Sequence, residues 1–192
     1  MFRQQRWLVV GLGNPGEKYR NTRHNLGALV VERFGQLHDS KFQAKRKMHA
    51  DVAEVSVSGV KSVLARPTTY MNESGVAVAS LASYYSVPTE RIIIVHDELD
   101  LAFDTLRLKL GGGDNGHNGV ISVKDHLGTS EFMRVRMGIG RPTNGQPPAD
   151  YVLAKFSAAQ SQALPATLDL GSKAIEALLV NGLVTAQNEF NS

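Results

Sequence analysis

Four consecutive β-branched apolar residues, Ile92 to Val95, are the feature that most constrains the fold of this chain. Pro88 precedes them and charged residues follow almost at once. Such a run is typical of a strand that is buried on both faces of a sheet. In open α/β sheets, ligands bind beyond the carboxyl ends of the strands, so we expect Asp97 or Asp100 to lie near a ligand. The simpler alternative is that these acids only cap the next turn, since Asp favours turns.

Strand-like and helix-like segments alternate along the chain. Apolar runs and period-two alternation predict strands, whereas apolar residues at helical spacing predict helices. The predicted strands span residues 7–10, 50–57, 60–65, 92–95, 105–110 and 132–139. The predicted helices span residues 25–37, 73–85, a short segment that ends near 127, and 159–180, with loops between these elements. This alternation predicts a single three-layer α/β domain over residues 1–192, with a twisted mixed β-sheet flanked by helices.

Local signals predict where some of these elements begin and end. Thr22 or Asn25 is expected to cap the first helix, because their side chains can accept hydrogen bonds from the first helical N–H groups. Ser58-Gly59 is expected to close a hairpin between two strands, which makes that pair antiparallel. Gly182 is expected to end the last helix.

Composition limits the compartment and the chemistry. Hydrophobic residues make up 42% of the chain and charged residues 20%, which is typical of a globular protein rather than a disordered one. The longest apolar run near the N-terminus, Trp7 to Val10, is too short for a membrane span or a signal peptide. We therefore expect a cytoplasmic protein with no membrane partner. The absence of cysteine excludes disulfides, thiolate nucleophiles and zinc–thiolate sites.

The chain is mildly basic, with 21 Lys and Arg against 18 Asp and Glu and a net charge of +3. This excess permits a nucleic-acid partner without requiring one. The basic residues gather in two sets, which are Lys41, Lys45, Arg46 and Lys47, and then Arg107, Lys109, Lys124, Arg134, Arg136 and Arg141. Either set could form a positive patch for RNA, and the alternative is a solvated face that keeps the protein soluble.

The loop from Gly11 to Gly16 matches the pattern G-x-G-x-x-G, which raises the alternative of a dinucleotide-binding oxidoreductase. That fold needs a helix directly at the glycines and an acid on the next strand about 20 residues further on. Here Pro15 and the residues up to Arg23 continue as loop, and Glu32 falls within a helical pattern. The sequence therefore disfavours a nucleotide site.

A second glycine-rich loop follows the predicted strand at residues 105–110. Five glycines fall within residues 111–119, so the segment is either a flexible linker or a loop whose backbone approaches a ligand closely. His117 and Asn118 within it favour the second possibility.

Several polar side chains at the predicted ends of strands and helices suit hydrolysis; they are Asn14, His24, Asn72, Asp97, His117 and Asn118. Histidine beside a carboxylate is a common pairing for general-base catalysis. Asn side chains can bind a carbonyl or stabilise an oxyanion. Without cysteine or a G-x-S-x-G motif, water activated by histidine is the simplest nucleophile. The histidines could instead bind a metal, but neither H-E-x-x-H nor a comparable ligand spacing is present.

Four motifs resemble, in their order along the chain, those of the bacterial peptidyl-tRNA hydrolase family. They are Gly11-Leu12-Gly13-Asn14-Pro15-Gly16 with Tyr19 and Thr22-Arg23-His24-Asn25, then Pro67-Thr68-Thr69-Tyr70-Met71-Asn72, then His96-Asp97-Glu98-Leu99-Asp100, then Gly116-His117-Asn118-Gly119. The resemblance implies hydrolysis of the ester between a nascent peptide and the tRNA terminus, which recycles tRNA from abandoned translation. It also implies a monomer with the family's α/β fold and with no cofactor and no metal.

The resemblance also implies a role for individual residues. His24 matches the catalytic base, Asp97 the acid that holds it in its basic form, and Asn14 the residue that distinguishes peptidyl-tRNA from unblocked aminoacyl-tRNA. The positions that match the groove for the tRNA terminus and the peptide are Tyr19, Tyr70, Asn72 and Asn118. Those that match binding of the tRNA acceptor end are Lys109 and Arg136. We also expect Arg134 and Arg136 to share a strand face that is free for phosphate.

Two positions depart from the family's pattern, and one alternative keeps the fold without the reaction. Ile121 stands where members often carry Lys or Arg, and Asp114-Asn115 replaces a more neutral, glycine-rich pair. Both changes lower the positive charge near the glycine loop. The alternative is a non-catalytic RNA-binding relative that serves as a splicing partner. The presence of His24, Asp97 and the Asn residues favours the enzyme.

Overall fold

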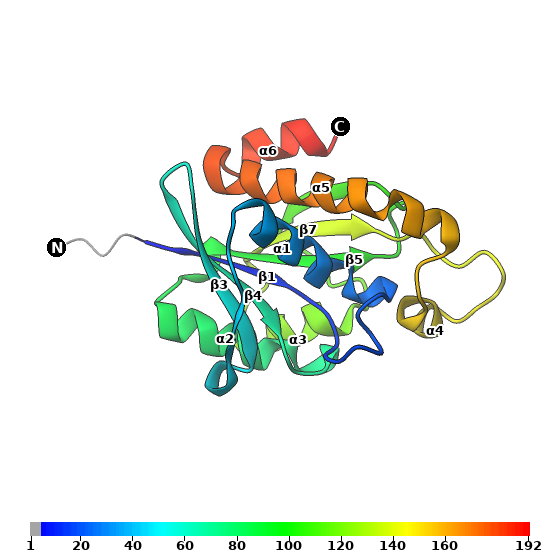
Figure 1. Ribbon diagram of the computed structural model, residues 1–192, viewed down its shortest axis with the longest axis horizontal. Helices are drawn as coiled ribbons and strands as arrows, with labels where there is room; N and C mark the ends of the chain where they lie inside the picture. Colours follow the sequence, from blue (N-terminus) through cyan, green and yellow to red (C-terminus); the bar gives the residue numbers. More distant parts are fainter. Residues whose placement is uncertain (1–4) are drawn as a thin grey trace.

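The computed structural model describes residues 5–192, which form a seven-stranded mixed sheet between two layers of helices (Figure 1). The strands are β1 (Trp7–Gly11), β2 (Gln43–Lys45), β3 (Ala50–Val57), β4 (Val60–Pro67), β5 (Ile92–Glu98), β6 (Leu106–Leu110) and β7 (Met133–Gly138). The α-helices are α1 (Leu26–Leu37), α2 (Ser74–Tyr85), α3 (Asn118–Leu127), α4 (Pro148–Leu153), α5 (Ala158–Asn181) and α6 (Leu183–Phe190). The predicted three-layer α/β architecture is confirmed.

The sheet has the strand order β2-β3-β4-β1-β5-β7-β6, with parallel strands at its centre. β1 is parallel to β4 and β5, and β5 is parallel to β7, whereas β2, β3 and β6 each pair antiparallel. The predicted hairpin joins β3 to β4, where Ser58 and Gly59 both have positive φ, at 49° and 81°. Positive φ at both central residues gives the turn a twist that matches the twist of the flanking strands.

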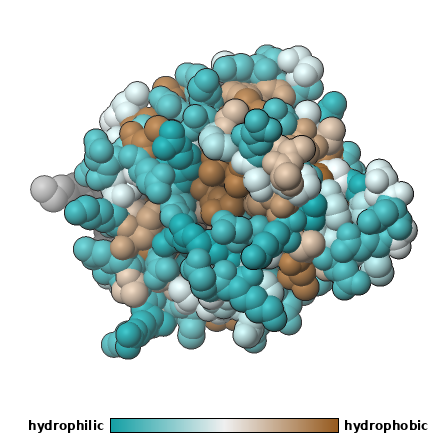
Figure 2. Space-filling view, turned by 45° about the vertical axis from the view of Figure 1, so that its right-hand side comes forward, coloured by the Kyte–Doolittle hydropathy of each residue, from teal (hydrophilic) through white to brown (hydrophobic). Residues whose placement is uncertain are grey.

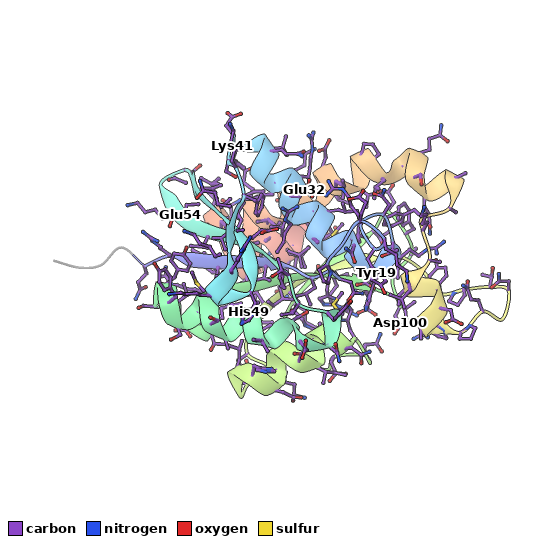
Figure 3. All side chains as sticks on the ribbon, turned by 60° about the horizontal axis from the view of Figure 1, so that its bottom comes forward. Tyr19, Glu32, Lys41, His49, Glu54 and Asp100 are labelled. Carbon is purple, nitrogen blue, oxygen red and sulfur yellow. The ribbon has the colours of Figure 1, made fainter. Side chains whose placement is uncertain are left out.

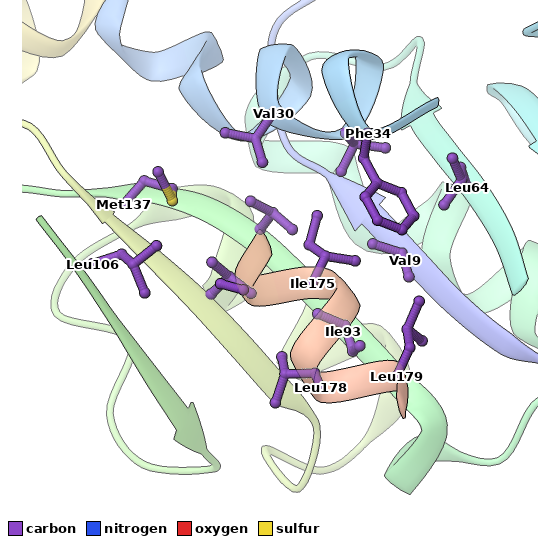
Figure 4. Close-up of a cluster of buried hydrophobic side chains, with 14 of the residues drawn as sticks. Val9, Val30, Phe34, Leu64, Ile93, Leu106, Met137, Ile175, Leu178 and Leu179 are labelled. Atoms are coloured by element: carbon purple, nitrogen blue, oxygen red, sulfur yellow. The ribbon is translucent and has the colours of Figure 1, made fainter. Parts of the chain in front are cut away.

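Alternate residues of the central strands face opposite layers. Val9 and Ile93 pack with α1 and α5 through Val30, Phe34 and Ile175, which Figure 4 shows as one cluster. The next residues along the strands, which include Leu8, Ile92 and Ile94, belong to a second cluster with side chains of α2 and α3. Because both faces are covered, the central strands are apolar throughout, as the run at Ile92 to Val95 predicted.

β5 is longer than the sequence predicted, and this is a correction that bears on function. The prediction ended the strand at Val95, where the apolar run ends, but the strand continues to Glu98. His96, Asp97 and Glu98 are all buried and pair in register with β7. Charged residues are tolerated inside this strand because distant segments supply partners for their side chains, as described below.

Three elements were missed, and the predicted cap holds only in position: Asn25 is the N-cap residue of α1 but makes no side-chain hydrogen bond to the helix. The three residues of β2 are exposed and α4 has no buried residue, so neither carries a strong apolar pattern, and α6 follows Gly182, where the last helix was predicted to end. Neither Thr22 nor Asn25 caps α1 through its side chain. The Thr22 hydroxyl donates to the Tyr19 carbonyl, and the Asn25 amide bonds with Asn14 instead.

The helices of residues 5–192 include none that combines the length and the apolar character needed to span a membrane. The longest, α5, has 24 residues and contains Pro165.

Candidate active site

The site lies at the sheet edge where the parallel strands β1 and β5 both end. Asp97 is near the end of β5, and its side chain follows Val95 on the face that α1 covers. The loop after β1 brings His24 to the same place, in a short 3₁₀ turn over Arg23–Asn25 that leads into α1. Sheet order therefore brings together two residues that are far apart in the sequence.

His24 and Asp97 form a close, buried pair. The Nδ1 atom of His24 lies 2.9 and 3.1 Å from the two carboxylate oxygens of Asp97. The two residues are 8% and 3% exposed. A carboxylate can only accept, so Nδ1 carries the proton and donates it. The other ring nitrogen, Nε2, is then unprotonated and makes no hydrogen bond within residues 5–192.

His117 donates to the same carboxylate, a contact that the sequence did not predict. Its Nε2 lies 2.8 Å from Asp97 Oδ1. Its Nδ1 accepts hydrogen bonds from the backbone N–H groups of Gly119 and Val120, at 3.1 and 3.3 Å, so His117 is the N-cap of α3. Because Nδ1 is an acceptor, the proton of the neutral ring must be on Nε2. The available signal was the position of His117 in the glycine loop that leads into a short predicted helix, although histidine is an unusual N-cap.

The two histidines change the acidity of the Asp97 carboxyl, and Asp97 changes that of His24. Burial by itself would raise the pKa of Asp97, but His24, His117 and the N–H groups that they donate hold it well below its usual value. Burial opposes a charge on His24, yet the Asp97 carboxylate outweighs this effect and raises the pKa of the imidazole. His24 is therefore a stronger base than an ordinary histidine, with its basic nitrogen free.

The same three side chains could in principle hold a metal ion, since their ligand atoms all lie within 4.8 Å of one another. A metal requires an unprotonated nitrogen from each histidine. His117 Nδ1 already accepts two backbone N–H groups, and its Nε2 must keep its proton to donate to Asp97. Metal binding would break these hydrogen bonds, which favours the predicted site without a metal.

Hydrogen bonds hold the backbone and the side-chain oxygen of Asn14, and its amide nitrogen makes none within residues 5–192. Its Oδ1 accepts the backbone N–H of Met71 at 2.7 Å. Its own backbone is held by the Asn25 side chain, which accepts from Asn14 N and donates to Asn14 O, both at 2.9 Å. With Oδ1 occupied, Nδ2 is the group that Asn14 can offer to a ligand, and it can only donate.

The four residues predicted to line a groove lie in the loops that surround this pair. Asn118 is exposed at the start of α3 and lines a cleft together with His24. Tyr70 is 58% exposed, and Asn72 is exposed in the turn that leads into α2. Tyr19 is half-buried in the loop after β1, and Figure 3 shows it at the same end of the molecule as Asp100.

Arg134 and Arg136 were predicted to share a face free for phosphate, but the two side chains differ in exposure. Arg134 is only 2% exposed, and its Nη2 donates to the carbonyls of Gly111 and Gly113 at 2.9 and 2.8 Å. The prediction that Arg134 is free for phosphate is therefore wrong, because its guanidinium is buried and hydrogen-bonded to the backbone of the glycine loop. Arg136 is half-buried and its Nε donates to Glu98 at 3.2 Å.

Lys109 is partly exposed on β6 and is paired in register with Arg134. Its side chain lies against the backbone of Gly112, where an added Cβ would be 2.4 Å from Lys109 Cε. The glycine loop therefore packs over the lysine stem. The ion pairs found within residues 5–192 do not include Lys109.

A cleft of about 160 Å³ opens beside His24 and Asp97. Its apolar wall includes Leu99, Pro148 and Val152, of which the last two come from α4, a helix that the sequence did not predict. Figure 2 turns this end of the molecule forward and shows hydrophobic side chains near the middle of the face, with hydrophilic ones around them. The cleft joins an apolar wall to the basic nitrogen of His24.

The structure also excludes the dinucleotide alternative. The chain leaves β1 through a loop and a 3₁₀ turn, so α1 begins at Leu26 and not at the glycines. Glu32 lies on α1 rather than on a strand. A pyrophosphate would find no helix N-terminus at Gly11–Gly16.

Known proteins match nearly the whole chain. The family model described as peptidyl-tRNA hydrolase matches residues 8–192. Peptidyl-tRNA hydrolase of Frankia alni is 47% identical over 186 residues, which cover 97% of this chain and 94% of that protein. The enzyme of Mycolicibacterium smegmatis is 48% identical over 181 residues, which cover 94% and 95% of the two chains.

A solved structure agrees. A crystal structure of peptidyl-tRNA hydrolase from Acinetobacter baumannii has a TM-score of 0.90 to this chain at 35% identity, and the match covers 100% of this chain and 97% of that one. The order of the motifs, the strand order and these matches agree with one another, and the chain belongs to the peptidyl-tRNA hydrolase family.

Proposed function

We propose that this chain hydrolyses the ester that joins peptide to tRNA in peptidyl-tRNA, and so recycles tRNA from abandoned translation. The observation that carries the proposal is the His24–Asp97 pair, in which Nδ1 donates to the carboxylate and Nε2 faces no partner within residues 5–192. This arrangement is suited to a general base that acts on water.

In the proposed reaction, His24 Nε2 takes a proton from water as its oxygen attacks the ester carbonyl carbon. The carbonyl oxygen becomes an oxyanion, which amide donors such as those of the Asn residues can stabilise. The bond between the carbonyl carbon and the ribose oxygen then breaks, and the imidazolium gives its proton to that oxygen, which leaves as the hydroxyl of the tRNA. The products are a peptide acid and tRNA, so the enzyme class is that of the carboxylic ester hydrolases.

Asp97 supports this cycle in two ways. It fixes the His24 ring and its tautomer through Nδ1, and its charge stabilises the imidazolium that forms. We further propose that Asn14 Nδ2 donates to a carbonyl of the peptide main chain, because its Oδ1 is committed to Met71. An unblocked aminoacyl-tRNA has a cationic amine and no peptide carbonyl there, so Asn14 would favour the peptidyl form.

We propose that Tyr19, Tyr70, Asn72 and Asn118 line the groove for the tRNA terminus and the peptide, and that Lys109 and Arg136 bind phosphate. The Nε of Arg136 is committed to Glu98, so its two Nη groups are the ones that a phosphate could bind. A monomeric state, a cytoplasmic location, independence from metal and cofactor, and a single domain over residues 1–192 stay predictions.

The deciding experiment is release of N-acetyl-phenylalanine from N-acetyl-phenylalanyl-tRNA by the purified chain, with a chelator and without added nucleotide. We expect turnover by the wild-type chain and none above background by His24→Ala. Binding of tRNA without any hydrolysis would reject the proposal and favour the non-catalytic RNA-binding relative. Hydrolysis that stops when the chelator is added would reject the metal-free mechanism.

A further inference from the structure

A second cleft, of about 270 Å³, lies on the other side of the loop that carries His24. His24 lines the first cleft, and Asn14 and Asn25 line the second. Asn25 follows His24 directly in the chain and is bonded to Asn14, so these residues form a ridge between the two clefts. The substrate ester also has two parts, the tRNA and the peptide, which extend from its carbonyl group in different directions. We call them the tRNA arm and the peptide arm.

The first cleft suits the tRNA arm. Its apolar wall can accept the flat face of a base, and stacking of bases on apolar or aromatic surfaces is the usual mode for unpaired nucleotides. Glu98 lines this cleft and holds Arg136, so Arg136, which is proposed to bind phosphate, lies on this side of His24.

The second cleft does not suit a polyanion. Its lining contains two arginines, Arg20 and Arg66, against the three acids Glu17, Glu32 and Asp51. A phosphate backbone needs an excess of positive charge, which is absent from this lining. The peptide is the remaining arm, and its main chain offers both N–H donors and carbonyl acceptors without net charge.

The charged groups of this cleft are held in place by one another. Glu32, labelled on α1 in Figure 3, accepts from Arg20 on one oxygen and from Arg66 on the other, both at 2.8 Å. Arg66 also lies 3.6 Å from Asp51 and stacks over Phe42 at 4.5 Å from the ring centroid. A network this constrained presents donors and acceptors at fixed positions, which lowers the entropy lost when a ligand binds.

We infer that this cleft is a subsite for the nascent-peptide main chain, beyond the residue that is esterified to tRNA. This subsite rests on the proposed function. Longer peptidyl-tRNAs are the substrates that use the cleft. Arg20 and Arg66 donate to peptide carbonyls and Glu32 and Asp51 accept from peptide N–H groups. Because the contacts are to the main chain, the subsite is indifferent to side-chain sequence. A blocked single amino acid reaches Asn14 at the edge of the cleft but is too short to reach Arg20 and Arg66.

The test compares two substrates with the same tRNA and the same esterified residue. One is N-acetyl-phenylalanyl-tRNA, and the other has four glycines between the acetyl group and phenylalanine, which supply main chain without side chains. We expect the wild-type chain to have a higher kcat/KM for the longer substrate, by roughly two- to tenfold for each hydrogen bond gained. In Arg20→Ala and in Arg66→Met, the ratio of the two kcat/KM values should fall toward one.

Arg33→Ala is the matched control. Arg33 is adjacent to Glu32 on α1 and forms an ion pair with Asp169, but it is not part of the cleft, so the ratio should stay at the wild-type value. Arg20 lies in an exposed loop, so Arg20→Ala tests the subsite even where Arg66→Met impairs folding. Equal kcat/KM for the two substrates in the wild-type chain, or an unchanged ratio in Arg20→Ala, would overturn the subsite alone. Failure of the wild-type chain to cleave either substrate would overturn the proposed function and the subsite with it.

Discussion

His24 donates its Nδ1 proton to Asp97 at 2.9 Å, although 73 positions separate the two residues in the chain. The pairing depends on β1 and β5 being neighbours in the sheet, because each strand delivers one partner to the same edge. All of the proposed chemistry depends on this contact, and the first predictions test its two members.

Replacing His24 by Ala should lower kcat by about 10²- to 10⁴-fold, the range in which a general base contributes. Binding of uncharged tRNA should be retained, because the proposed phosphate contacts are Lys109 on β6 and Arg136 on β7, and His24 is not one of them. Hydrolysis of N-acetyl-phenylalanyl-tRNA and tRNA binding are the two measurements. His49→Asn is the control, since His49 is exposed and outside the clefts. Near-normal turnover by His24→Ala would remove the general-base assignment.

Asp97→Asn should slow the reaction by on the order of 10²-fold and move the acid limb of the pH profile to lower pH. His24 must be neutral to accept a proton, so kcat/KM falls as pH falls through its pKa. Asp97 raises that pKa above the ordinary value, whereas burial lowers it, so removal of the carboxylate leaves burial to act alone. A pH–rate profile of both proteins checks the direction. An acid limb that stays in place would mean that His24 is not the titrating group.

His117→Asn should move the acid limb in the opposite direction. Asn can still cap α3 but is too short to reach Asp97, so the hydrogen bond to the carboxylate is lost, together with the ring contacts to His24 and His96. Asp97 then interacts more strongly with His24 and raises its pKa further, which shifts the limb to higher pH. A merely structural role for His117 would lower activity at every pH without moving the limb.

Asn14→Asp should impair cleavage of blocked substrates by roughly tenfold or more, the loss expected for an unpaired polar group. The carboxylate can still accept the Met71 N–H but has no proton to give to a peptide carbonyl. Its charge also attracts the free ammonium of unblocked aminoacyl-tRNA, so discrimination against that substrate should weaken. The measurement is kcat/KM for N-acetyl-phenylalanyl-tRNA and for phenylalanyl-tRNA. An unchanged ratio would place recognition of the blocked amine elsewhere.

Lys109→Ala should weaken binding of uncharged tRNA and reduce the slope of log K against log salt by roughly 0.7 to 0.9, as expected per phosphate contact. Lys173→Ala is the control, because Lys173 is exposed on α5, in a helical layer that is not proposed to bind tRNA. Arg136 requires a milder change, since Arg136→Ala would leave the buried Glu98 without its cation. Arg136→Gln keeps a donor near Glu98 and should reduce the slope similarly. Unchanged slopes in Lys109→Ala and Arg136→Gln would reject both phosphate contacts.

His96 should make the fold sensitive to acid. It is fully buried, its Nδ1 donates to the Asp97 carbonyl and its Nε2 has no partner among residues 5–192. Burial is the main cause that holds its pKa well below the ordinary 6.5, and the neighbouring His117 ring and the Arg134 guanidinium also disfavour a proton on it. The unfolded chain therefore binds a proton below about pH 6.5 that the folded chain does not, so stability falls as pH falls.

Urea unfolding between pH 6 and pH 4.5 checks this prediction. The free energy of unfolding of the wild-type chain should fall more steeply than that of His96→Asn, by up to about 1.4 kcal/mol per pH unit. His96→Asn keeps a donor for the Asp97 carbonyl but cannot titrate, and its overall stability is lower because it is smaller. Parallel pH dependence in the two proteins would mean that His96 is not the group responsible.

The sequence by itself determined the layers of this fold and the order of its motifs. Period-two and helical spacing report which face of a segment is buried, so β3, β4, α1 and α5 were predicted close to their observed limits. The motifs around His24, Asp97 and Asn118 likewise identified the family before any contact was known. These signals are local, because each depends on residues that are neighbours in the chain.

Only the tertiary structure decided what the polar residues contact. Asp97 accepts from His117 as well as His24, Arg134 is buried beneath the glycine loop, and Arg66 joins Glu32 in the second cleft. Each of these contacts joins segments that the sheet order or the helix packing brings together. Hydrophobic periodicity records that a side chain is buried, but it carries no information about which distant group satisfies a buried charge, and that choice depends on the packing of the whole fold.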